Sequence, residues 1–161
     1  PLLIASALYF VLLGASPVAL AALGESAMYP PASARQLASG AVAAVSGAGN
    51  RVQLSVRSSQ LASGTVIREY LDASGKVIAI EWQGPTLPDL QLLLGSYFAR
   101  YVKAQSQIQV QSARPADISH RHAQLRDSDV VIESHGHLRA FQGRAYLPAM
   151  LPAGFSIDQI Q

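Results

Sequence analysis

Six large apolar side chains recur at helical spacing in the middle of the chain, and they constrain its fold more than any other feature. This spacing, i, i+3, i+4, i+7, i+8 and i+11, puts them on one face of a helix with 3.6 residues per turn. Each is worth roughly 1.5 to 3 kcal/mol when buried, so the face needs a core to cover it. The six are Leu90, Leu93, Leu94, Tyr97, Phe98 and Tyr101.

The residues just before this apolar face predict where the helix begins. Thr86 is a favourable N-cap, Asp89 follows three residues later, and Pro88 lies in the first turn, where a missing N–H group costs nothing. We therefore expect one main amphipathic helix over about residues 87–103. Gly95 lies inside it, and should weaken it by about 1 kcal/mol relative to alanine unless another segment packs closely there.

Apolar and polar residues alternate on both sides of the helix, which predicts β-strands. The order of strands, helix and strands predicts an α+β fold, with one main amphipathic helix packed on a curved, mostly antiparallel sheet. We expect Phe155 and Ile157 to fold back onto the end of the core. The predicted strands are 52–56, 65–71 and 76–82 before the helix, with a hairpin turn at 72–75, and 105–111, 130–132 and 138–146 after it, with a turn at 134–137.

The first 24 residues carry no charge, and an apolar run there ends at Ala19-Leu20-Ala21, the small-x-small pattern that signal peptidase cuts. We expect residues 1–21 to be a secretory signal peptide, and the mature protein to be periplasmic or secreted. A retained membrane anchor and a buried N-terminal helix are the alternatives, and we expect membrane contact only if this segment is retained.

The rest of the chain has the length of one compact domain. Residues 22–50 are dominated by Ala, Ser and Gly, with few large apolar side chains, so we expect a low-complexity linker there. We expect residues 51–161 to form a single α+β domain.

Composition excludes several classes of function. The chain has no cysteine, so it has no disulfide, thiolate nucleophile or Cys-ligated metal, and we expect no cofactor. Its formal net charge of +2 argues against nucleic-acid binding.

Several phrases in the second half of the chain are similar to a family of small exported bacterial proteins, catalogued as domain of unknown function 2844. Together they are spread over most of the length from residue 63 to residue 157. The resemblance implies a cell-envelope or secreted protein and carries over no catalytic or binding residue. The phrases are Ser63–Tyr70, Trp82–Leu90, Gly95–Phe98, Gly136–Phe141 and Gly143–Pro148.

The four histidines come as two His-x-His pairs, His120 with His122 and His135 with His137. On a strand, residues i and i+2 point the same way, so each pair could offer two imidazoles to one zinc or copper ion. Surface histidines without a metal are the alternative interpretation.

Three glutamates, Glu69, Glu81 and Glu133, fall on predicted strands, where facing carboxylates could do acid–base work. Alternation on the wet face of a sheet produces the same pattern without catalysis, and no Gly-x-Ser-x-Gly motif is present. The sequence therefore leaves enzyme activity open and favours a protein that is not an enzyme.

The second predicted hairpin offers the best candidate binding surface, with Arg139, Phe141, Arg144 and Tyr146 on what we expect to be an edge strand. The leading hypothesis is a non-enzymatic exported module that binds or scaffolds another cell-envelope protein. A small periplasmic enzyme or metal-binding protein using the His-x-His pairs is the rival.

Overall fold

The structure is a computed structural model, and it describes residues 22–26, 34–45, 51–111, 122–152 and 155. Of residues 41–45, 51–53, 108–111 and 122 it describes the backbone. The predicted signal peptide, His120 and Ile157 lie outside the described residues.

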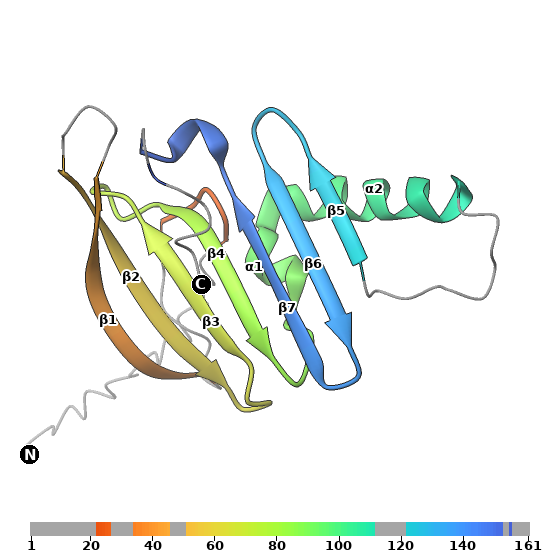
Figure 1. Ribbon diagram of the computed structural model, residues 1–161, viewed down its shortest axis with the longest axis horizontal. Coiled ribbons are helices and arrows are strands. Elements are labelled where there is room, and N and C mark those ends of the chain that lie inside the picture. Colours follow the sequence, from red (N-terminus) through yellow and green to blue (C-terminus); the bar gives the residue numbers. More distant parts are fainter. Residues whose placement is uncertain (1–21, 27–33, 46–50, 112–121, 153–154, 156–161) are drawn as a thin grey trace, which may run out of the picture.

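Seven strands of the described chain form one antiparallel sheet (Figure 1). Their order across the sheet is β1-β2-β3-β4-β7-β6-β5, so the two halves of the chain meet where β4 pairs with β7. The strands are β1 Ala34–Val45, β2 Arg51–Leu61, β3 Val66–Leu71, β4 Val77–Gly84, β5 His122–Arg126, β6 Val131–His137 and β7 Ala140–Tyr146.

The helical segment between β4 and β5 lies behind the sheet in the view of Figure 1. It consists of α1 Leu90–Leu94, the short 3-10 helix η1 Gly95–Tyr97 and α2 Phe98–Gln111, and a second 3-10 helix, η2 Pro148–Met150, follows β7. No helix in the described part of the chain is long and apolar enough to cross a membrane. The α+β fold expected from the sequence is confirmed.

The predicted apolar face of the helix packs into the core. Leu90, Leu93, Leu94 and Tyr101 are buried, while Tyr97 and Phe98 are partly buried against the same cluster. The residues that the sheet contributes to this cluster are mainly Ile67, Ile80, Trp82, Ala123, Ile132 and Ala145.

The helix begins three residues later than predicted. Asp89 is the N-cap, and its Oδ1 accepts a hydrogen bond of 3.2 Å from the backbone N–H of Leu92. Thr86 serves another purpose, because its carbonyl oxygen accepts a 2.7 Å bond from the hydroxyl of Thr65. The prediction of Thr86 as the cap was wrong because a tertiary partner occupies its polar groups.

Gly95 interrupts the helix where the N-terminal segment meets it. Its φ of +53° lies in the region that favours glycine, and a Cβ there would lie 2.5 Å from the Cβ of Ala22. The backbone of Leu23 donates to Leu93, and that of Gly24 donates to Val77 of β4. The close packing that would justify a glycine inside the helix is therefore present.

The structure differs from the predicted linker over residues 22–50. Ala22 and Leu23 are buried, Leu23 with 1% of its surface exposed, and residues 34–45 form β1, which pairs with β2 along its length. Residues 27–33 and 46–50 lie outside the described residues. A strand of small residues carries little apolar alternation, so the sequence signal for β1 is weak.

Two other local predictions were wrong. Residues 105–111 continue α2 instead of forming an edge strand. His135 and His137 belong to β6, and the hairpin turn lies at Leu138 and Arg139. In both places short polar segments support either structure, and the neighbours in the fold decide between them.

Candidate functional site

The face of the sheet opposite the helices is divided into an apolar end and a polar end. The apolar end gathers Leu54, Tyr70, Ile78 and Ala79, and the chain after β7 packs against it. That chain contributes Met150, Leu151 and Phe155, so the predicted return of Phe155 onto the core is confirmed. The polar end has no such cover among the described residues.

A row of alternating charges crosses the polar end, one residue from each of four neighbouring strands. Arg68 on β3 lies opposite Glu81 on β4, and Glu81 lies opposite Arg144 on β7. Arg144 in turn lies opposite Glu133 on β6. Opposite charges in facing positions stabilise a sheet by roughly 0.2–1 kcal/mol per pair, so the row contributes to the fold as well as to the surface.

The ion pairs of the row are short. Arg68 Nη1 donates to Glu81 Oε2 at 3.0 Å, and Arg144 Nε donates to Glu133 Oε2 at 2.8 Å. Glu133 also accepts from two side chains of β5, at 2.8 Å from Arg126 Nη2 and at 3.1 Å from Gln124 Nε2. Both of its carboxylate oxygens are thus held in place.

Glu133 is kept ionised by these partners. Its burial alone would raise the pKa of the carboxyl, but the hydrogen bonds from Arg144 and Arg126 outweigh this effect and hold the pKa below its ordinary value. A carboxylate of this kind is a fixed acceptor at neutral pH and a poor proton donor.

Glu69 has the opposite character and lies on the other face of the sheet, next to Ile80. Burial raises the pKa of its carboxyl, and Arg57 at 3.9 Å offsets this only in part. The sheet separates Glu69 from Glu81 and Glu133, so the three glutamates do not form one acid–base site.

Replacing Glu133 with glutamine should lower the free energy of unfolding by about 1.5–3 kcal/mol at pH 7. Because the folded pKa is lowered, the carboxylate stabilises the fold above its ordinary pKa of 4.5, and this stability is lost as the pH falls through the folded pKa. The deficit of Glu133→Gln in urea unfolding should therefore shrink between pH 7 and pH 3.

Glu69→Gln is the matched control, because its stability relative to the parent should change with pH in the opposite direction. Its raised pKa makes the parent protein lose stability as the pH rises through 4.5 toward the folded pKa, so this variant should gain stability relative to the parent over that interval. Parallel pH profiles for the two variants would contradict the roles given to both carboxylates.

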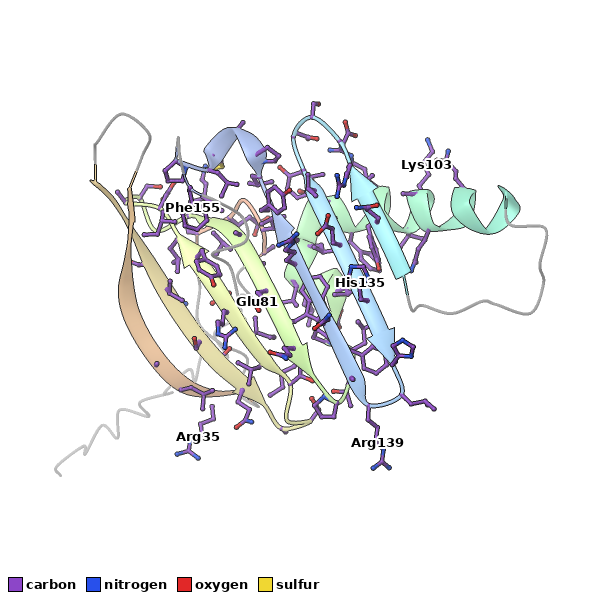
Figure 2. All side chains as sticks on the ribbon, in the orientation of Figure 1. Arg35, Glu81, Lys103, His135, Arg139 and Phe155 are labelled. Atoms are coloured by element: carbon purple, nitrogen blue, oxygen red, sulfur yellow. The ribbon has the colours of Figure 1, made fainter. Side chains whose placement is uncertain are left out.

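Two shallow depressions open at the polar end. The first, of about 480 Å³, is lined by Glu81, Trp82, Gln83, Glu133, His135, Gln142, Gly143 and Arg144. The second, of about 450 Å³, continues from it toward the β6–β7 turn and shares Gln83, His135 and Gln142 with it. Figure 2 labels Glu81 and His135 on β4 and β6. We call the following side chains the polar face: Arg68, Glu81, Gln83, Glu133, His135, Gln142 and Arg144.

The predicted binding residues of the second hairpin are divided between places: Arg139 and Phe141 line the second depression, and Arg144 lines the first. Arg139 lies at the turn with φ +61° and points away from the molecule (Figure 2), whereas Phe141 lies against Gly136, where an added Cβ would be 2.6 Å from its ring. Arg144 belongs to the polar face, and Tyr146 packs at the apolar end. β7 pairs with β4 and β6, so the prediction of an edge strand was wrong.

The histidines are arranged differently from their sequence pairs. His135 and His137 lie exposed on β6, and the backbone of β5 places His122 directly opposite His135. Among the side chains that the structure describes, no three His, Asp or Glu groups are grouped closely enough to hold a metal ion.

Sequence reasoning missed Gln83 of the polar face and its pairing with Gln142, which lies opposite it on β7. Each is a single glutamine in an alternating strand, which is no signal by itself. Their pairing could be read only from the register of two strands that are separated by about sixty residues of sequence.

A comparison with protein-family models finds a match to Protein of unknown function (DUF2844) over residues 19–160. The chain belongs to the DUF2844 family. The match confirms the resemblance and includes β1 and the buried residues Ala22 and Leu23 in the family's domain. Comparisons with curated proteins and with solved structures found no match.

Proposed function

We propose that this DUF2844 protein is an exported, non-enzymatic binding module, and that the polar face is its binding surface. The observation that carries the proposal is the row of charges in register across β3, β4, β7 and β6, beside a shallow depression of about 480 Å³. Broad, shallow and polar surfaces of this kind suit recognition of another surface better than enclosure of a small substrate.

The fixed geometry of the row favours binding. Glu133 and Arg144 already hold each other at 2.8 Å, and the side chain of Glu133 is only 10% exposed, so little side-chain freedom is lost when a partner arrives. A general acid or base would need a group that exchanges protons near neutral pH, and the ionised Glu133 does not serve as one.

The charge pattern favours a partner that carries both signs of charge. Positive and negative groups alternate across the polar face, so a uniformly anionic polymer such as a nucleic acid would meet repulsion at Glu81 and Glu133. A protein surface with alternating charges can complement the row. We therefore propose another protein of the cell envelope as the partner.

Site-specific photo-cross-linking tests this assignment. A photoreactive amino acid is placed at Gln142 or Gln83, both exposed on the polar face, or at Lys103, exposed on α2. We expect a discrete cross-linked product in intact cells from the first two positions and none from Lys103. Equal products from all three positions, or none from Gln142 and Gln83, would refute the polar face as the binding surface.

The same cross-linking cultures test export. Ala22 and Leu23 are buried against the helix and β4, which supports a mature chain that keeps these residues and begins at Ala22. Intact mass of the protein in the periplasm or medium should match a chain starting there. Recovery of the longer chain in the membrane fraction would show that residues 1–21 are a membrane anchor and not a cleaved signal peptide. That result would not affect the binding surface, which the cross-links test separately.

A further inference from the structure

The register between β5 and β6 brings together two histidines that do not belong to the same His-x-His pair of the sequence. His122 and His135 are directly opposite in an antiparallel pair. Facing residues in such a pair have Cβ atoms about 4.5–5.5 Å apart on the same side of the sheet. Residues i and i+2 of one strand are about 6.5–7 Å apart. The pair across the strands is therefore closer than His135 and His137, which lie two residues apart on β6.

The surroundings of His135 have room for a metal ion and its water ligands. His135 and His137 are exposed on the face that the helices do not cover, and both line the depression of about 450 Å³. Figure 2 shows His135 on β6, between β5 and β7. His137 lies two residues further along the same face, where a third imidazole would stand.

We propose that His122 and His135 form a binding site for a divalent transition metal ion, with His137 next to it. Imidazole nitrogen suits zinc, copper and nickel, and it binds zinc at about 2.0–2.1 Å. Glu133 is excluded as a ligand because both of its oxygens are held by Arg126, Gln124 and Arg144.

This site overlaps the proposed binding surface at one residue, His135, and the two proposals are tested by different experiments. It needs only the β5–β6 pair, whereas the polar face extends over β3, β4 and β7 as well. A metal ion there would add positive charge at the β5 side of the polar face, next to His135.

Titration of the tag-free exported protein with zinc chloride in a calorimeter tests the proposal. We expect one zinc ion per chain at pH 7.5, and a loss of affinity of at least tenfold in His122→Ala and in His135→Ala. Zinc binding should weaken as the pH is lowered, because imidazole binds a metal ion only in its neutral form. Lys103→Ala, which removes an exposed side chain of α2, is the control and should bind zinc as the parent does.

Copper(II) provides a second readout that does not depend on affinity. Its electron paramagnetic resonance spectrum should show two or more nitrogen ligands in the parent protein and fewer in His122→Ala. Zinc affinity that is unchanged in His122→Ala would overturn the proposal, as would the absence of zinc binding in a parent protein whose melting curve shows that it is folded.

Discussion

Replacing Gly143 with alanine should lower the free energy of unfolding by about 3 kcal/mol or more, at the upper end of what overpacking costs. A Cβ on Gly143 would lie 2.2 Å from Cζ2 of Trp82 and 2.5 Å from the carbonyl oxygen of Glu133. Trp82 is fully buried and the carbonyl belongs to the backbone of β6, so neither neighbour can move away cheaply. Thermal or urea unfolding of the purified variant measures the cost.

Gly40→Ala is the matched control for this prediction. Gly40 lies on β1, its φ is outside the region that favours glycine, and a Cβ there would meet nothing within 4 Å. We expect its stability to stay within about 0.5 kcal/mol of the parent, as at ordinary surface positions. If Gly143→Ala were as stable as Gly40→Ala, the contact between Trp82 and β7 would be wrong.

Leu94→Ala should cost about 2–5 kcal/mol, the usual range for a leucine removed from a core. Leu94 is fully buried between the helix and the sheet, where it belongs to the same cluster as Ile80 and Trp82. Removal of its methyl groups would leave a cavity that the rigid strands on one side cannot close. Phe98 is only partly buried, so Phe98→Ala should cost less than Leu94→Ala.

Leu92 provides the control on the same helix, because it lies two residues from Leu94 and is 42% exposed. Leu92→Ala keeps the helix propensity and removes little buried surface, so its unfolding curve should nearly coincide with that of the parent. A Leu94→Ala variant that also melts with the parent would mean that the helix is not packed on the sheet.

Gly143→Ala and Leu94→Ala both disturb the packing on the helix side of the sheet, and this packing holds the polar face in place. Trp82 belongs to β4 and Gly143 to β7. The same two strands present Gln83, Gln142 and Arg144 on the other side of the sheet. The packing on the helix side therefore sets the spacing of these polar side chains. Loss of that packing should affect binding through the sheet as well as stability.

The sequence by itself determined the elements whose signals are local. The apolar face from Leu90 to Tyr101 needs only the helical repeat to be recognised, and the hairpin of β3 and β4 needs only alternation and a turn. The turn at 72–75 was likewise encoded locally: Asp72 accepts from the backbone of Ser74 and Lys76, and Gly75 has a φ of +79°. These elements were enough to predict an α+β fold.

Only the tertiary structure decided which strands are neighbours. Alternation shows which residues share a face of one strand, but the pairing of β4 with β7 joins segments that the helix and two strands separate in the sequence. The row from Arg68 to Glu133 and the position of β7 inside the sheet both depend on this pairing. Pairing between distant strands is set by how the whole core closes, and no single stretch of sequence encodes it.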